Sequence, residues 1–335
     1  MRFSRMLKTI DTHTLGQPTR TVIGGAPRLK GRTMSEKMTC LRENADWVRT
    51  VLMHEPRGSG VMSGALITEP CRPDADIGVI YFEVGGYVPM CGHDTIGACT
   101  ALLEAGMIEA TEPETRIAFD TPAGLVRVVA EVCDGTVESV RFNNVPSFLY
   151  RADVTVDVPG TGRVTCDLAY GGNFYAILPA SAVGLEILPE NAGRLIAAGN
   201  RIRDTINATV PVCHPEMPII NRITYVQFTG PPRTPGADGQ NCVVIEPASL
   251  DRSPCGTGTS ARVAALHARG ELALGQEFVY ESIICTRFVA RAVETTRVGN
   301  LPAIVPEIKG QAFVTGLHTF VVSPNDPVPN GFVLA

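Results

Sequence analysis

The chain has 335 residues, of which 44% are hydrophobic and 19% charged, and its formal net charge is −5. This length is enough for one large or two medium domains with a hydrophobic core. The negative charge argues against a nucleic acid or an anionic membrane as the partner, and no apolar run approaches the roughly 20 residues that a bilayer-spanning helix needs. The first residues lack the apolar core of a signal peptide, so we expect a cytoplasmic protein.

Short strands bounded by turn residues dominate the chain. Runs of β-branched and apolar residues between Gly, Asp-Gly and Pro turns predict strands within 75–86, 125–145, 153–172 and 240–248. Helical periodicity predicts helices at about 42–53, 95–105, 192–209 and 259–269. This pattern predicts an α+β fold with mainly antiparallel sheets rather than a doubly wound parallel sheet. The Pro- and Gly-rich stretch 229–240 is expected to be a surface loop.

The ten cysteines are scattered along the chain and form no CxxC pair. In a chain of this length without a secretion signal, most are expected to be reduced and buried as small apolar residues. Core packing is therefore the default explanation for any single cysteine.

Two of the cysteines stand out because their surroundings repeat. When Cys91 is placed on Cys255, identical residues also meet at the pairs Gly92/Gly256, Thr95/Thr259, Ala101/Ala265, Leu102/Leu266 and Gly106/Gly270. Both segments read as a Cys-Gly turn, a helix and a glycine at the position of a helix C-cap. The repeat predicts two similar half-chains, each with a cysteine at the amino end of a buried helix.

A cysteine at this position has a specific chemical meaning. The first turn of a helix carries unpaired N–H groups and a partial positive charge, which lower the pKa of a thiol there and bind a carboxylate. If the two half-chains face each other, one sulfur lies on each side of the α-carbon of a bound carboxylate. That arrangement predicts racemisation or epimerisation by two bases.

The residue inventory argues against the usual cofactors. Pyridoxal phosphate needs a Schiff-base lysine, and the four lysines, Lys8, Lys30, Lys37 and Lys309, lie far in sequence from both cysteine motifs. The segment CGTGTS lacks the lysine of a phosphate-binding loop, and the histidines show no HExxH spacing. We expect no cofactor and no metal, although metal ligands distant in sequence stay open.

Six segments resemble the proline racemase family, which includes the hydroxyproline 2-epimerases. They are MCGHDTIG (90–97), DRSPCGTGTSA (251–261), IDTHTLGQPTR (10–20), HEPRGSG (54–60), YGGNFYAI (170–177) and NDPVPNGFVLA (325–335). The resemblance implies a cofactor-independent two-thiol mechanism on an imino acid and, commonly, a homodimer. It also implies a pseudo-symmetric fold like that of diaminopimelate epimerase, in which each half is a mixed, mostly antiparallel sheet wrapped on a central helix.

In that fold the active site lies in the cleft between the halves. We expect residues 1–140 and about 310–335 to form the half that carries Cys91, and residues 141–309 the half that carries Cys255.

The resemblance also implies roles for individual residues. Cys91 and Cys255 would be the two acid/base groups, and the neighbouring substrate contacts would be Gly92, His93, Asp251, Gly256 and Thr257. Asp251 would meet the ring nitrogen, and Gly256 and Thr257 would donate amides to the carboxylate. Each has a structural alternative: His93 as a polar residue of the first turn, Asp251 as a turn or cap residue, and Thr257 acting only through its backbone.

The substrate is harder to predict. Ser63 and Ile245 match positions where proline racemases tend to carry phenylalanines, and Tyr225 stands where hydroxyproline epimerases often have histidine. Smaller or polar residues leave room for a ring hydroxyl, which favours 4-hydroxyproline over proline. Two further departures are Gln17, where glutamate is frequent, and Asp94, where glycine is common; the charge of Asp94 is expected to raise the pKa of Cys91.

Three alternatives to a 4-hydroxyproline 2-epimerase stay open. The first is proline racemase. The second is a trans-3-hydroxyproline dehydratase, which is disfavoured because that branch carries threonine at the position of Cys255. The third is a non-catalytic imino-acid-binding protein or redox-sensing dithiol.

Overall fold

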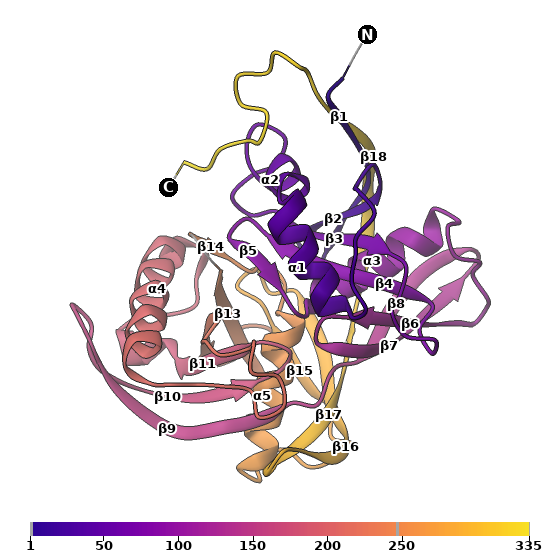
Figure 1. The fold of residues 1–335 in the computed structure, drawn as a ribbon. Helices are drawn as coiled ribbons and strands as arrows, with labels where there is room; N and C mark the ends of the chain where they lie inside the picture. Colours follow the sequence, from indigo (N-terminus) through magenta and orange to yellow (C-terminus); the bar gives the residue numbers. More distant parts are fainter. Residues whose placement is uncertain (1–2, 246–247, 335) are drawn as a thin grey trace. The chain divides into compact units, whose positions relative to one another are not determined.

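The computed structural model describes residues 3–245 and 248–334, and the chain divides into two compact units (Figure 1). Unit 1 comprises Met1–Phe142 and Gly310–Ala335, and unit 2 comprises Asn143–Lys309. The first boundary lies two residues after the one expected from the sequence.

The sheet of unit 1 is mixed and mostly antiparallel. Its strands are β1 (Arg5–Thr14), β2 (Gln17–Gly24), β3 (Ser63–Thr68), β4 (Ile77–Glu83), β5 (Gly86–Val88), β6 (Glu114–Thr121), β7 (Gly124–Cys133), β8 (Thr136–Asn143) and β18 (Ala312–Val322). The C-terminal strand β18 pairs antiparallel with β1, which also pairs antiparallel with β2. Parallel pairs occur between β2 and β3 and between β4 and β6.

Three helices accompany this sheet: α1 (Met34–Ala45), α2 (Trp47–Met53) and α3 (Gly92–Glu104). The prediction of a single helix at 42–53 was wrong, because the segment begins earlier and is split at Asp46. The early start had a signal in the sequence. Thr33 followed three residues later by Glu36 is a capping pattern, and the Thr33 hydroxyl accepts a hydrogen bond from the Glu36 N–H at 3.1 Å.

The helix α3 is the centre of unit 1, since each of its residues from Gly92 to Leu103 is buried. A helix that is buried on every face lies inside the fold rather than on its surface. Gly97 permits close packing on β1 and β2, because a Cβ atom there would lie only 2.6 Å from Thr12 Oγ1 and 2.9 Å from Thr19 Oγ1. The elements that hold α3 in place are therefore packed against its first two turns.

Unit 2 repeats this plan with different strands. They are β9 (Phe148–Val158), β10 (Gly162–Tyr170), β11 (Phe174–Pro179), β12 (Tyr225–Gly230), β13 (Gly239–Ile245), β14 (Ser249–Leu250), β15 (Phe278–Glu281), β16 (Arg287–Val298) and β17 (Leu301–Gly310). The pairs β11–β12 and β13–β15 are parallel, and the other pairs from β9 to β17 are antiparallel. Of the strand predicted at 240–248, Glu246 and Pro247 lie outside the described residues.

The helices of unit 2 are α4 (Ala192–Thr209) and α5 (Gly256–Ala268), with short 3₁₀ turns at Ala180–Val183 and Pro189–Asn191. α5 is the buried counterpart of α3, and its residues from Gly256 to Ala261 are all buried. The predicted fold of a mostly antiparallel sheet around a central helix is thus confirmed in each unit. Within the described ranges, we find no helix with both the length and the apolar character needed to cross a bilayer.

Candidate active site

Cys91 lies immediately before α3, where it is the N-cap residue in an extended conformation with φ −138° and ψ 119°. Only 5% of its surface is exposed. Its carbonyl accepts hydrogen bonds from the N–H of Thr95 at 3.1 Å and from the Thr95 hydroxyl at 2.7 Å. Two hydrogen bonds to Thr95 therefore fix the backbone of Cys91 to the first turn of the helix.

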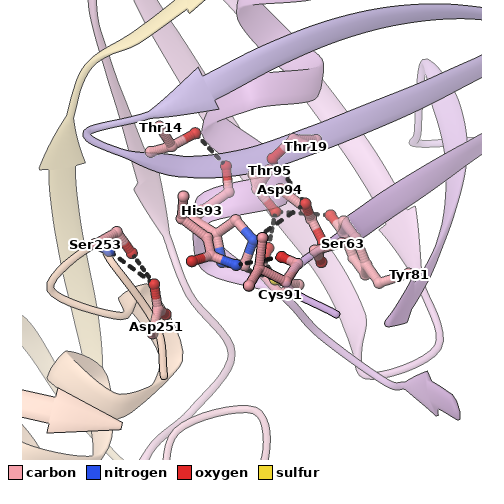
Figure 2. Close-up of polar contacts among 12 residues, drawn as sticks. Thr14, Thr19, Ser63, Tyr81, Cys91, His93, Asp94, Thr95, Asp251 and Ser253 are labelled. Carbon is pink, nitrogen blue, oxygen red and sulfur yellow. Dashed lines mark hydrogen bonds and ion pairs between the residues drawn. The ribbon is translucent and has the colours of Figure 1, made fainter. Parts of the chain in front are cut away.

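The Cys91 thiol begins a chain of three side chains (Figure 2). Its Sγ lies 3.3 Å from Nδ1 of His93, and Nε2 of His93 lies 3.2 Å from Oδ1 of Asp94. An ionised carboxylate only accepts hydrogen bonds, so Nε2 carries a hydrogen, and in the neutral form of the ring Nδ1 is then the acceptor. The arrangement therefore positions His93 to receive the proton of the Cys91 thiol.

Asp94 is fixed by hydroxyl groups from the neighbouring strands (Figure 2). Thr19 on β2 donates to Oδ1 at 2.7 Å, and Ser63 at the start of β3 donates to Oδ2. Burial alone would raise the pKa of Asp94, but the charge that His93 carries when protonated and the hydrogen bonds from His93, Ser63 and Thr19 lower it overall. The carboxylate is therefore held in its ionised form beneath the imidazole.

The thiol pKa differs from the expectation for a helix N-terminus. Burial raises the pKa of Cys91 well above its usual value, and the charges of Asp94 and Glu83 raise it further, whereas the N–H of Asp94 lowers it. The prediction of a pKa lowered toward neutrality was wrong, because desolvation outweighs the helix-end hydrogen bond. The expected effect of Asp94 is confirmed in direction.

Cys91, His93 and Asp94 also form the group of potential metal ligands found among the described residues. Their ligand atoms lie within 4.8 Å of one another. These atoms are already joined by the hydrogen bonds described above, which suits proton transfer without an ion.

Cys255 occupies the matching position before α5, but its backbone is different. Its φ is +61° and its ψ 103°, a conformation that non-glycine residues rarely adopt and that costs about 1–3 kcal/mol. The side chain is 6% exposed, and its Sγ accepts a hydrogen bond from the Gly258 N–H at 3.4 Å. In this conformation the thiol contacts the first turn of its own helix.

A tyrosine that the sequence did not single out also contacts this thiol. The hydroxyl of Tyr175 on β11 lies 3.4 Å from Cys255 Sγ and also hydrogen-bonds with the Thr257 hydroxyl. The side chain of Thr257 is thus engaged, in addition to its backbone. The signal for Tyr175 was available, since it lies within the YGGNFYAI segment that carries the family resemblance.

Burial raises the pKa of Cys255, and the charge of Asp251 raises it further. Hydrogen bonds from Tyr175, Gly258 and Thr257 act in the opposite direction without overcoming these effects. The expected lowering was therefore wrong for this thiol as well, for the same reason.

Asp251 shapes the turn that leads into α5. Its Oδ1 accepts from both the N–H and the hydroxyl of Ser253, each at 2.8 Å (Figure 2), and the Ser253 hydroxyl accepts from the Cys255 N–H at 3.1 Å. The turn-forming alternative for Asp251 is thus present in the structure. Its buried carboxylate still lies near enough to Cys255 to influence the thiol.

The remaining predicted residues lie near one or the other of two clusters, the first around Cys91 in unit 1 and the second around Cys255 in unit 2. Gly92 is the first residue of α3, and Ser63 is linked to it through Asp94. In unit 2, Gly256 begins α5, the ring of Tyr225 lies 5.3 Å from that of Tyr175, and Ile245 pairs with Ser249 beside the turn of Asp251. Asp94 and Thr19 join the first cluster although neither was predicted to bind substrate.

Comparison with known proteins identifies the family of the chain. The family model for proline racemase matches residues 9–333. A 4-hydroxyproline 2-epimerase of Streptosporangium roseum is 51% identical over 337 residues, and a proline racemase of Clostridioides difficile is 47% identical over 334 residues, each over 100% of both chains.

Solved structures match the same family. A hydroxyproline epimerase from Agrobacterium vitis with bound trans-4-hydroxy-L-proline matches with a TM-score of 0.93 and 38% identity, covering 100% of this chain and 97% of that one. A PhzF-family protein from Bacillus anthracis, 14% identical with a TM-score of 0.58 over 95% and 100% of the two chains, shares the fold. The chain therefore belongs to the proline racemase family of pyridoxal-phosphate-independent racemases and epimerases.

Proposed function

We propose that this protein is a two-thiol epimerase that inverts the α-carbon of a proline-type imino acid, with 4-hydroxyproline as its substrate. The observation that carries the proposal is the matched placement of Cys91 and Cys255. Each is buried, each is the N-cap of the central helix of its unit, and each has a hydrogen-bonding partner at its sulfur. Cofactor-free inversion needs one acid and one base, and the two thiols supply this pair.

In the proposed reaction one cysteine acts as a thiolate and removes the α-proton, while the other acts as a thiol and donates a proton to the opposite face. The raised pKa values favour this chemistry, because a thiolate of higher pKa is a stronger base toward a weakly acidic C–H. His93 assists on one side by accepting the Cys91 proton at Nδ1. Backbone N–H groups of the first turns, including those of Gly256 and Thr257, are proposed to bind the substrate carboxylate.

The choice of 4-hydroxyproline rests on two kinds of support. The relatives include proteins named 4-hydroxyproline 2-epimerase from Streptosporangium roseum and Paracoccus denitrificans, at 51% and 46% identity. In this chain, Ser63 offers a hydroxyl where a phenylalanine would pack against an unsubstituted ring. Its proton is already donated to Asp94, so Ser63 has only lone pairs to offer a substrate hydroxyl.

Proline racemisation is the second candidate function, because relatives named proline racemase match at 44–47% identity. Ser63→Ala distinguishes the two readings when kcat/KM is measured for trans-4-hydroxy-L-proline and L-proline. If Ser63 binds the ring hydroxyl, kcat/KM of the variant falls about tenfold or more with hydroxyproline and changes little with proline. The reason is that a buried polar contact discriminates strongly between substrates with and without the hydroxyl.

Thr19→Val is the matched control, because Thr19 also donates to Asp94 but is not a predicted substrate contact. Thr19→Val should change kcat/KM by the same factor for both substrates. Wild-type preference for proline, or equal losses with both substrates in Ser63→Ala, would contradict the assignment of hydroxyproline to this site.

Tyr225, Ile245 and Asp251 remain proposed substrate contacts in unit 2. The homodimer and the cytoplasmic location expected from the sequence remain predictions as well.

A further inference from the structure

Unit 2 contains a cavity that the proposed chemistry does not use. Its volume is about 930 Å³, which lies within the range of small-molecule sites. Its walls come from α5, from β15 and from the loop 231–238, the Pro- and Gly-rich segment noted in the sequence. None of the cysteines or proposed substrate contacts lines it.

Two polar groups in this cavity lack hydrogen-bond partners among the described residues: Nε of Arg262 on α5 and the hydroxyl of Tyr280 on β15. Tyr280 is only 1% exposed. A buried polar group left unsatisfied costs about 1–3 kcal/mol, so two such groups in one cavity point to a ligand that satisfies them. A carboxylate suits both, because it accepts from a guanidinium and from a phenol.

The loop wall of the cavity is fixed rather than loose. The buried carboxylate of Glu281 accepts hydrogen bonds from the Arg233 N–H and the Thr234 hydroxyl. Arg287 donates to the Pro235 carbonyl at 2.8 Å and also to Thr234. The cavity is therefore built into the fold, with one side tied down at several points.

The other residues that line the cavity set two further requirements for the chemistry of a ligand. Buried apolar side chains form part of the wall, namely Leu185, Ile187, Leu266, Leu272 and Phe278. Exposed carboxylates also line the cavity, namely Glu186, Asp238, Glu271 and Glu277. The exposed acids outnumber the lining arginines, Arg233 and Arg262, which disfavours a simple anion and favours a ligand that carries a positive charge as well.

We propose that this cavity binds a zwitterionic amino acid with an apolar side chain. Its carboxylate contacts Arg262 and Tyr280, its ammonium group faces the exposed carboxylates, and its side chain lies on the apolar wall. Arg262 is on the helix that begins directly after Cys255, so the ligand site and the thiol share one rigid element.

Isothermal titration calorimetry with L-phenylalanine tests this site in the intact protein. The matched probes are 3-phenylpropanoate, which lacks the ammonium group, and phenethylamine, which lacks the carboxylate. Saturating trans-4-hydroxy-L-proline keeps the probes out of the proposed active site. We expect saturable binding of L-phenylalanine and at least tenfold weaker binding of both analogues.

The variants Arg262→Gln and Tyr280→Phe assign the contacts. Arg262→Gln should weaken binding of L-phenylalanine by tenfold or more. Tyr280→Phe should weaken it several-fold while leaving the fold intact, because it removes a hydroxyl that has no partner. Arg194→Gln, which alters an exposed arginine on α4 outside the cavity, should bind like the wild type.

Absence of binding by the wild type up to millimolar L-phenylalanine would overturn the proposal. Wild-type affinity for L-phenylalanine in both Tyr280→Phe and Arg262→Gln would overturn it as well. Equal affinity for 3-phenylpropanoate would refute the zwitterion. If sedimentation showed that Arg262→Gln dissociates an oligomer and the wild type bound no probe, the cavity would be a contact with a second copy instead. The effects of Arg262→Gln and Tyr280→Phe on probe binding need no epimerase activity, and only the blocking of the active site by trans-4-hydroxy-L-proline rests on the proposed function.

Discussion

At the scale of single residues, the two thiols share burial and a raised pKa but differ in their partners. Cys91 contacts an imidazole supported by the carboxylate of Asp94, whereas Cys255 contacts the phenol of Tyr175. A nearby carboxylate raises the pKa of each thiol, Asp94 at Cys91 and Asp251 at Cys255, whereas the phenol of Tyr175 acts on Cys255. Asp94 raises the pKa of Cys91, and the hydrogen bond from Tyr175 lowers the pKa of Cys255.

Asp94→Asn should lower the pKa of Cys91. The variant removes the negative charge, keeps the backbone N–H that stabilises the thiolate, and retains an amide of the same shape beside Thr19 and Ser63. Since only the thiolate is alkylated, the midpoint of the pH–rate profile should shift to lower pH. Iodoacetamide labelling of Cys91 in a Cys255→Ser background, followed by mass spectrometry, measures this profile.

Tyr175→Phe provides the opposite control at the other thiol. It removes a hydrogen bond that lowers the pKa of Cys255, so the labelling midpoint in a Cys91→Ser background should move to higher pH. An unchanged midpoint in Asp94→Asn, or a shift in the same direction for both variants, would contradict this account of the two environments.

At the scale of elements, the repeat correctly identified α3 and α5 but placed their starts too late. The expected starts at residues 95 and 259 follow the first turn, which contains glycine, histidine and aspartate in one case and two glycines in the other. Such residues lower helix propensity, and burial in a packed core overrides that preference. The glycines after both helices behaved as predicted, with φ of 66° at Gly106 and 74° at Gly270.

The backbone difference between the two N-caps could not be read from the sequence. Cys91 and Cys255 occupy equivalent positions, yet φ is −138° at one and +61° at the other. Sequence identity at the repeat reports which residues correspond, whereas a left-handed φ depends on how the preceding turn enters the helix. The turn of Asp251 and Ser253, which has no counterpart in the repeat, provides that entry.

Glycine and alanine substitutions at the two cysteines should show the difference in backbone conformation as a difference in the free energy of unfolding. At Cys255, glycine relieves the strained backbone and alanine does not, whereas at Cys91 no such strain exists. Because both residues are N-caps, the capping preference for glycine over alanine cancels in the comparison. The Gly-minus-Ala difference in unfolding free energy should be larger at Cys255 by about 1 kcal/mol. Urea denaturation measures it, and equal differences at both sites would show that the strain is absent.

At the scale of the whole molecule, the sequence sufficed for the fold class and the family, because six segments spread over the chain carry the resemblance. It also singled out the two cysteines that are the N-caps of the central helices. It did not reveal Tyr175 and Thr19 as partners of the site, since each reaches it from a strand distant in sequence. The direction of the thiol pKa was missed because burial depends on the packed core, which no local motif reports.

Removal of metal ions should leave turnover unchanged, because two thiols supply both proton transfers and no proposed step needs a Lewis acid. Dialysis against EDTA followed by assay of the wild type checks this. Added Zn²⁺ should inhibit, since Cys91, His93 and Asp94 would bind it and occupy the thiol. Loss of activity on dialysis with recovery on adding a divalent ion would refute the thiol-only mechanism.

The central claim is that Cys91 and Cys255 act on opposite faces of one α-carbon. The most direct measurement is NMR of deuterium incorporation at that carbon in D₂O, starting separately from each epimer of 4-hydroxyproline, in the wild type, Cys91→Ser and Cys255→Ser. We expect inversion with deuterium uptake in the wild type and loss of inversion in both variants. We further expect that each variant retains exchange without inversion from one epimer only, and that the two variants retain it from opposite epimers. Inversion at the wild-type rate in either variant, or retained exchange from the same epimer in both, would contradict the central claim.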